Sequence, residues 1–295
     1  MEKKDFGRLV AALRQDLNLT QFDLAERAGL DVAIVSQVER GVRQHLEPPL
    51  LRSLATALEL KIHERRPFFS AASGLEEFDL WGTGAEAEER KIEKSLETLD
   101  KLIAVMDYLR APAYVEDAFG EIVAANSSTL EFYRITPELM EEAARIPLGY
   151  NVIRLMFGNI ISSVVTNDYD KYLLNSVRAF REMSLPVRAH PYFRYLMAKF
   201  RDPKKYPGFE RYWRHAALLE DDKDINVDAF EYVHALYGPL HYITIATIPN
   251  TPHGELRLIY NIPMDQRTAE IFEQIASAVG TKAHKFAPWP VKQMV

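Results

Sequence analysis

The residues that could carry out catalysis or bind a metal do not gather into any of the usual motifs. The 295-residue chain has no cysteine, which excludes disulfides, thiolate metal sites, iron–sulfur clusters and cysteine nucleophiles. It has no HExxH, no GxSxG, no glycine-rich phosphate loop and no dinucleotide fingerprint. His234 and His241 fall near expected strands, but no carboxylate pattern accompanies them. We therefore expect no enzyme, no catalytic residue, no metal site and no cofactor.

Composition points to a packed chain that stays off the membrane. The apolar fraction of 47% is ordinary for packed cores. No window approaches eighteen uninterrupted apolar residues, and the start MEKKDFGRL lacks the apolar core of a signal peptide. We expect a cytoplasmic protein with no membrane partner.

Four short helices are expected in the first sixty residues. Apolar residues at positions 6, 10, 13 and 17 line one face of a helix from Asp5 to Leu17. Thr20 can cap the backbone N–H of Asp23, and the Asp23 carboxylate can reach back, so a second helix begins there. Gly29 can take the positive φ that ends this helix.

Asp31 can cap a third helix, Val32–Arg40, which places Val35 and Val38 inward. A fourth amphipathic helix follows over Pro48–Leu58. Together these elements predict an all-α bundle over residues 1–66. The side chains expected on the outer face of the third helix are Val32, Ala33, Ser36, Gln37 and Arg40, while Ile34 is ambiguous between core and surface.

The pattern TQxxLAxxAG at residues 20–29, followed by SQVERG at 36–41, resembles the XRE/Cro/lambda-repressor helix-turn-helix family. The resemblance covers about residues 6–60. It implies sequence-specific binding to double-stranded DNA, with the third helix in the major groove and the second against the backbone.

That pose assigns roles to individual residues. Gln37 can pair with adenine, and aliphatic side chains can touch thymine methyl groups. The expected base contacts are Val32, Ala33, Ser36 and Gln37, and the expected phosphate contacts are Gln21, Arg14, Arg40 and Arg43. For Arg40 a helix C-terminal cation is the alternative, and for Arg14 a solvated helix face.

The weak positive charge of the first domain favours a dimer that binds DNA through specific contacts at defined positions. The net charge is −6, but residues 1–66 hold eleven Lys or Arg against ten Asp or Glu, so the acidic excess lies beyond them. So weak a positive field gives little non-specific affinity for DNA. We expect a homodimer on a pseudo-palindromic operator.

Residues 67–110 are expected to connect two domains. The segment 67–84 mixes Pro, Ser and Gly with Phe68, Phe69, Phe78 and Trp81, which we expect to pack on one of the domains. A helix follows over 85–109, with apolar residues at 92, 96, 99, 103 and 106. This seam is too short to decide between a coiled coil and a helix docked on the next domain.

Residues 111–280 predict a PAS-like α+β domain with an antiparallel sheet and covering helices. A hairpin over Ala113–Asn126 precedes a mostly helical middle. Strands return at Leu240–Ile248 and Leu256–Tyr260, before a last helix, Arg267–Val279. This order of elements is similar to that of a PAS domain, and residues 281–295 are expected to be a C-terminal tail.

Three segments resemble the MmyB-like ligand-binding domain that follows XRE domains in bacterial regulators: Ala113–Asn126, the sequence NVIRLMF at 151–157, and Phe209 with Trp213 and His215. The acidic residue that the family carries after the histidine is Ala216 here. The resemblance implies a pocket for a small apolar, fatty-acid-like ligand. A filled core that serves only dimerisation or a protein partner is the alternative.

A ligand carboxylate would need a cation or several donors near it. We expect Arg154 and His215 to supply these, with Tyr195 and Arg194 behind them. The alternatives are a structural salt bridge for Arg154 and a hydrogen-bonded core imidazole for His215. The resulting hypothesis is a transcriptional regulator in which pocket occupancy shifts the connecting helix and changes operator affinity.

Overall fold

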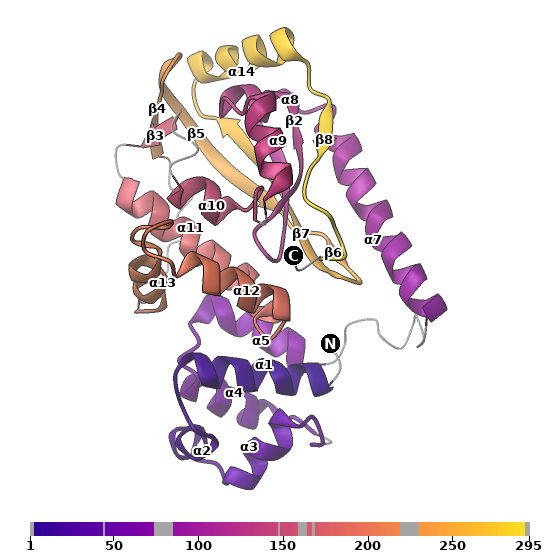
Figure 1. Ribbon diagram of the computed structural model, residues 1–295, viewed down its shortest axis with the longest axis vertical. Coiled ribbons are helices and arrows are strands. Elements are labelled where there is room, and N and C mark those ends of the chain that lie inside the picture. Colours follow the sequence, from indigo (N-terminus) through magenta and orange to yellow (C-terminus); the bar gives the residue numbers. More distant parts are fainter. Residues whose placement is uncertain are drawn as a thin grey trace.

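The structure is a computed structural model that describes residues 3–43, 45–73, 85–146, 148–158, 164–166, 169–218 and 230–292. Figure 1 shows a small helical body at the lower end and a larger body built on a sheet above it. We call them the N-terminal bundle (residues 3–73) and the sheet domain (residues 85–292). The expected fold class, an all-α bundle followed by an α+β domain, is confirmed.

The N-terminal bundle forms where local capping signals place it. Its helices are α1 (Lys3–Asp16), α2 (Gln21–Ala28), α3 (Val32–Glu39), α4 (Pro48–Ala57) and α5 (Ile62–Ser73). The capping box between Thr20 and Asp23 is present, and Gly29 ends α2 at a φ of 64°. Asp31 caps α3 by accepting from the Ala33 N–H at 2.7 Å. Val35 and Val38 are buried, as expected.

Helix α5 runs through the boundary that was expected near residue 66. Phe68 is fully buried in the core of the N-terminal bundle, 5.1 Å from Phe6 between ring centroids. This confirms that Phe68 packs on a domain, and Phe69 lies beside it. Phe78 and Trp81 lie outside the described residues. The bundle therefore extends into the segment that composition had marked as a linker.

The sheet is antiparallel at every pairing. Its strands are β1 (Ala113–Asp117), β2 (Ile122–Asn126), β3 (Val164–Thr166), β4 (Phe230–His234), β5 (Gly238–Thr247), β6 (Asn250–Thr251), β7 (Gly254–Pro263) and β8 (Ala283–Lys285). The order across the sheet is β3-β4-β5-β7-β1-β2-β8, and β6 pairs with β7. The hairpin and the two returning strands are confirmed. Strand β8 lies in the expected tail, where it pairs with β2.

Helix α7 (Ala85–Met106) covers one face of the sheet. Leu99, Leu102 and Met106 are buried against Val115 and Leu258. Of the two alternatives for the apolar seam, the structure shows the helix docked on the following domain. In this single chain, Ile92 and Leu96 lie half-buried along the flank of the helix.

The remaining helices of the sheet domain lie on the other side of the sheet, some against it and others packed on α11 (Figure 1). They are α8 (Ser127–Phe132), α9 (Pro137–Arg145), α10 (Val152–Phe157), α11 (Tyr169–Met183), α12 (Pro191–Phe200), α13 (Phe209–Leu218) and α14 (Gln266–Val279), with a 3-10 turn at Leu185–Val187. An aromatic core centred on Phe180, Phe193 and Trp213 joins α11, α12 and α13. These helices separate the sheet from the N-terminal bundle.

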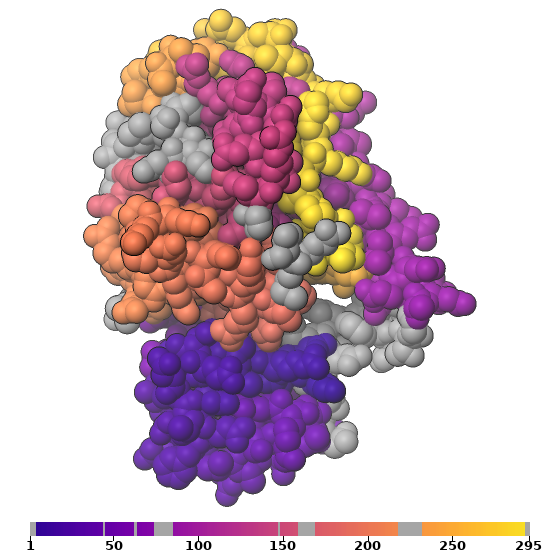
Figure 2. All heavy atoms as spheres, viewed as in Figure 1, coloured from indigo at the N-terminus to yellow at the C-terminus, as the bar shows by residue number. Residues whose placement is uncertain are grey.

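The two bodies meet through α5 and the segment from α11 to α12. Leu185 is fully buried and belongs to the core of the N-terminal bundle, although it lies in the sheet domain. Figure 2 shows the bundle in direct contact with the body above it. The contact orients α3 away from the sheet domain, at the lower end of the molecule in Figure 1.

Candidate DNA-binding face and ligand cavity

Helix α3 presents the residues expected to contact bases. Val32 and Ala33 are exposed, whereas Ser36 and Gln37 are half-buried. Ile34 is half-buried and packs against the core, which resolves its ambiguity in favour of the core. The N-terminal half of α3 is thus the open part, as major-groove reading by such a helix requires.

Glu39, at the end of α3, ties the helix to its neighbours. Its carboxylate accepts from Gln21 Nε2 at 2.7 Å and from Arg14 Nε at 2.6 Å. Arg14 also donates to the Leu19 carbonyl at 2.6 Å, and its side chain is 13% exposed. The hydrogen bond to Glu39 raises the pKa of Arg14. Arg14 therefore holds α3 in place, in contrast to both the phosphate contact and the solvated face expected from sequence.

The backbones of α1 and α3 also approach each other closely beside this network. A Cβ on Gly7 would lie 2.4 Å from the Glu39 carbonyl oxygen and 2.5 Å from that of Val38. Only glycine lets α1 pack this near the end of α3. Gly7 and Glu39 together fix the position of α3.

Two other expected phosphate contacts, Arg40 and Arg43, differ in exposure. Arg40 is exposed, with its Nε directed to the Ser36 carbonyl at 3.3 Å. Arg43 is half-buried, and its Nε has no hydrogen-bond partner among the described residues.

Two exposed apolar side chains on this body, Phe22 and Val42, were not predicted from the sequence; they are 63% and 55% exposed. The available signal was that Phe22 falls off the apolar stripe of α2.

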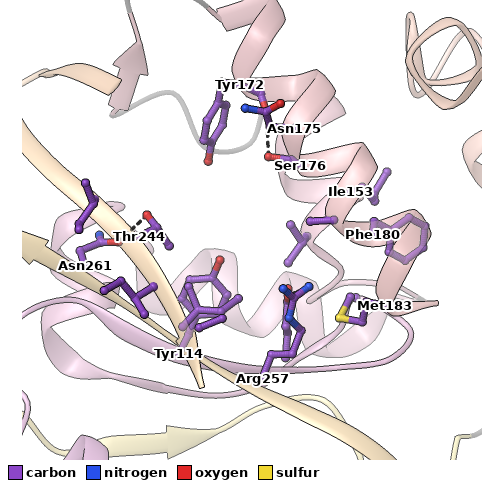
Figure 3. A pocket seen from close by; sticks show the side chains of 18 of the residues that line it. Tyr114, Ile153, Tyr172, Asn175, Ser176, Phe180, Met183, Thr244, Arg257 and Asn261 are labelled. Carbon is purple, nitrogen blue, oxygen red and sulfur yellow. Dashed lines mark hydrogen bonds and ion pairs between the residues drawn. The ribbon is translucent and has the colours of Figure 1, made fainter. Parts of the chain in front are cut away.

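A cavity of about 480 Å³ lies between the sheet and helices α10 and α11. Its size is in the range of small-molecule sites. Figure 3 shows the side chains that surround it, from the strands below and from α11 above. The lining residues that carry the argument are Tyr114, Glu116, Ile153, Phe180, Met183 and Arg257.

Five tyrosines line the cavity: Tyr114, Tyr133, Tyr172, Tyr232 and Tyr242. Tyr232 and Tyr242 stack with centroids 4.0 Å apart. Burial raises the pKa of Tyr114, Tyr172 and Tyr242 well above the ordinary value, so their hydroxyls stay neutral. Nearby, the Thr244 hydroxyl donates to Asn261 at 3.1 Å. The wall is apolar over its rings and polar at its hydroxyls.

Among the described residues, three with charged side chains line the cavity: Glu182 on α11, and the pair Glu116 and Arg257. Glu116 on β1 and Arg257 on β7 are directly opposite each other in the sheet, and Arg257 Nη1 lies 3.9 Å from Glu116 Oε1. Burial raises the pKa of Glu116 to about 7, although Arg257 opposes the shift. A carboxyl group that titrates near neutrality thus faces the cavity.

The residues expected to hold a ligand lie elsewhere. Arg154 donates to the Gly149 carbonyl at 2.8 Å and pairs with Glu142 at 3.5 Å, as in the structural alternative. Arg194 pairs with Asp16 of the N-terminal bundle.

His215 is exposed on α13, and Tyr195 is half-buried under the ammonium group of Lys199. None of Arg154, Arg194, Tyr195 and His215 is among the described residues that line the cavity. A signal for Glu116 did exist, because it alternates with Tyr114 along one strand and so shares its face.

A buried ion cluster joins the two bodies. Glu64 of α5 accepts from Arg188 at 2.6 Å and from Arg181 at 3.1 Å, and its side chain is 1% exposed. Burial disfavours the charged carboxylate, but Arg188 and Arg181 outweigh that effect and lower the pKa of Glu64 to about 2. The Arg181 guanidinium lies 4.5 Å from the centroid of the Trp213 ring.

Over the residues that the structure describes, no group of three His, Asp or Glu side chains is placed to hold a metal ion. Within the same ranges, no helix combines the length and the apolar character needed to cross a membrane.

Comparison with known proteins identifies both domains. Residues 5–68 match a helix-turn-helix domain, and residues 98–275 match the MmyB-like transcription regulator ligand binding domain. An uncharacterized HTH-type transcriptional regulator of Acanthamoeba polyphaga mimivirus is 40% identical over 57 residues, which cover 19% of this chain and 25% of the viral protein. Because the second family match spans more than half of the chain, the protein belongs to the family of transcription regulators that join an XRE-type helix-turn-helix domain to an MmyB-like ligand-binding domain.

Proposed function

We propose that this regulator binds a pseudo-palindromic operator as a homodimer, and that a small ligand with an apolar, fatty-acid-like body occupies the cavity and changes operator affinity. One observation carries the proposal: α11 lines the cavity on one side and binds the N-terminal bundle on the other. Phe180 and Met183 face the cavity, while Arg181 between them holds Glu64.

The DNA contacts follow from the exposed end of α3. Val32, Ala33, Ser36 and Gln37 read base edges, and Gln37 discriminates through its amide. Gln21, Arg40 and Arg43 contact phosphate. Arg14 acts indirectly by holding Glu39, which in turn fixes Gln21 and the end of α3.

The apolar body of the ligand lies against the aliphatic and aromatic part of the wall. Ile153, Phe180 and Met183 contribute there from α10 and α11. Filling the cavity restricts α11, because its side chains lose alternative positions against the sheet. Because Arg181 lies on the same helix, restricting α11 also changes the position of its guanidinium group relative to Glu64.

This route differs from the connecting helix considered from sequence. Helix α7 packs on the opposite face of the sheet from the cavity, whereas α11 contacts both the cavity and α5. Coupling between a ligand and DNA of this kind is typically about 1–3 kcal/mol, or roughly 5- to 150-fold in affinity.

The first test is native and denaturing mass spectrometry of freshly purified protein. A small apolar compound released only on unfolding supports the ligand proposal. Operator affinity is then measured by fluorescence anisotropy with and without that compound, and a change of fivefold or more supports the coupling. A protein that carries no compound and keeps one operator affinity would favour a domain used for dimerisation alone.

A further inference from the structure

The pair Glu116 and Arg257 has the geometry of a head-group site for the cavity ligand. The two residues are cross-strand partners on β1 and β7, so their side chains project to the same face of the sheet. That face carries the cavity, which both residues line. Figure 3 shows Arg257 rising from the sheet beside Tyr114, with Met183 and Phe180 nearby.

The pair is incompletely satisfied by the protein. The 3.9 Å separation is too long for a hydrogen bond, and Arg257 Nε is buried with no partner in the part of the chain that the structure describes. The Glu116 side chain is 8% exposed. Buried charged groups are normally hydrogen-bonded, because an unpaired one is costly. Donors of Arg257 and acceptors of Glu116 are therefore available to a ligand.

The opposite charges of Glu116 and Arg257 determine which ligand head group can bind between them. A ligand carboxylate alone would be attracted by Arg257 but repelled by Glu116, and an ammonium group would meet the reverse. A planar group with an acceptor beside a donor satisfies both, since its carbonyl accepts from Arg257 and its N–H or O–H donates to Glu116.

Resting on the proposed function, in which this cavity takes a ligand, we propose that the ligand ends in a primary carboxamide, or in a carboxylic acid group that shares one proton with Glu116, and that this head group bridges Arg257 and Glu116. The two head groups share one hydrogen-bonding pattern and differ in their need for a proton. A carboxamide is neutral at any physiological pH. A carboxylate can adopt the pattern only if one proton is taken up between it and Glu116.

Among the ionisable groups around the cavity, Glu116 is the one that we expect to take up this proton. Burial raises the pKa of Glu116 to about 7, with Arg257 opposing and Asp117 adding to the rise. Asp117 itself is paired with Lys292. Tyr114 on β1 and Tyr172 on α11 are neutral phenols, because burial raises their pKa values. Glu182 of α11 also lines the cavity and is the other carboxyl group to be tested.

The experiment is isothermal titration calorimetry of the full-length protein, freed of bound compounds, with decanoate and decanamide at pH 6 and pH 8. One proton taken up at a group of pKa about 7 weakens decanoate binding about tenfold between these pH values. Decanamide takes up no proton and needs an acceptor on Glu116, so its affinity does not fall over the same range. Repeating the decanoate titration at pH 8 in buffers of different ionisation enthalpy counts the proton taken up.

Three variants test whether the pH dependence of decanoate binding comes from Glu116 and Arg257. Glu116→Gln can donate an amide N–H to the decanoate carboxylate, so its binding at pH 8 matches that of the unmodified protein at pH 6 and loses its pH dependence. Glu182→Gln is the matched control and keeps the tenfold change. Arg257→Met weakens both probes at least tenfold. A decanoate pH dependence that persists in Glu116→Gln, or that appears equally with decanamide, overturns the inference.

Failure of this inference is distinct from failure of the proposed function. If neither probe binds while a compound extracted from the protein rebinds, the head-group inference is overturned and the ligand proposal stands. If both probes behave as expected and operator affinity stays constant, the head-group inference stands and the proposed coupling to DNA falls.

Discussion

The carboxylate of Glu64, on the last helix of the N-terminal bundle, lies 2.6 Å from the guanidinium of Arg188 in the sheet domain. Arg181 shares the same carboxylate oxygen at 3.1 Å. The pKa shifts within this cluster act in opposite directions. The lowered pKa of Glu64 stabilises the fold, whereas burial and the neighbouring Arg188 lower the pKa of Arg181 to about 10, which costs stability. The cluster therefore matters more for orientation than for net stability.

Glu64→Gln is expected to destabilise the protein by about 3 kcal/mol and to reduce the effect of ligand on operator affinity, because it leaves two buried guanidinium groups without a counter-charge. Urea denaturation and anisotropy titrations measure the two effects. Asp16→Asn is the control, since its ion pair with Arg194 is partly exposed and is worth less than about 1 kcal/mol. Equal losses in both variants would contradict the role of Glu64.

The contribution of Glu64 should disappear in acid. The pKa of this carboxyl is about 2 in the folded protein against an ordinary 4.5, so the stabilisation is present above 4.5 and is lost as the pH falls toward 2. The difference in unfolding free energy between the unmodified protein and Glu64→Gln should shrink by about 2 kcal/mol from pH 5.5 to pH 3. Urea titrations at the two pH values measure it, and a constant difference would contradict the assignment.

Two glutamines in the bundle should separate base reading from positioning. Gln37→Ala is expected to weaken operator binding by about 1–3 kcal/mol and to leave a scrambled sequence unchanged. Gln21→Ala should weaken both sequences alike, because it removes the proposed phosphate contact and a hydrogen bond to Glu39. Anisotropy with both DNA duplexes at fixed salt gives the comparison. Equal losses on both sequences for Gln37→Ala would refute its assignment.

Gly7→Ala should be destabilising although alanine favours helices by about 0.5–1 kcal/mol over glycine. The added Cβ would meet the backbone of Val38 and Glu39, so we expect a net loss of about 1–3 kcal/mol and weaker operator binding. Gly29→Ala is the control: it strains a left-handed residue, with no atom within 4 Å of the new Cβ. Thermal melts should show losses in both variants, and only Gly7→Ala should alter the operator affinity of folded protein.

Lys292, near the C-terminus, should be essential to the sheet domain. Its ammonium group pairs with Asp117 and, at 2.7 Å, with Glu121, and the side chain is 2% exposed. Lys292→Met leaves two buried carboxylates without a cation and should cost about 3–5 kcal/mol. Lys285→Met, whose pair with Asp100 is exposed, should cost less than about 1 kcal/mol. Urea denaturation measures both, and similar values would contradict the role of Lys292.

The helix-turn-helix unit could be read from sequence because its signals are local. Thr20 and Asp23 cap each other within one turn, and Gly29 supplies the αL residue that ends α2. The spacing of Val35 and Val38 then fixes which face of α3 is outward. Each of these interactions joins residues a few positions apart, so the pattern of residue types is enough to predict it.

The order of hairpin, helices and returning strands likewise predicted the class of the second domain. Strand β8 and the burial of Lys292 were missed, because edge pairing and a buried ion pair depend on what lies beside the tail in space. The docking of α7 was left open, since its apolar seam fits a partner helix and a sheet face equally well.

By itself, the sequence determined the two domains, helix α3 and its outward residues, because capping and periodicity act over one or two turns. Only the tertiary structure decided which charged side chains meet. It paired Arg14 with Glu39, Arg194 with Asp16 and Glu64 with Arg188, and it placed Glu116 and Arg257 in the cavity in place of Arg154 and His215. A long charged side chain can reach many partners, and the one it binds is set by which elements pack against it and exclude water.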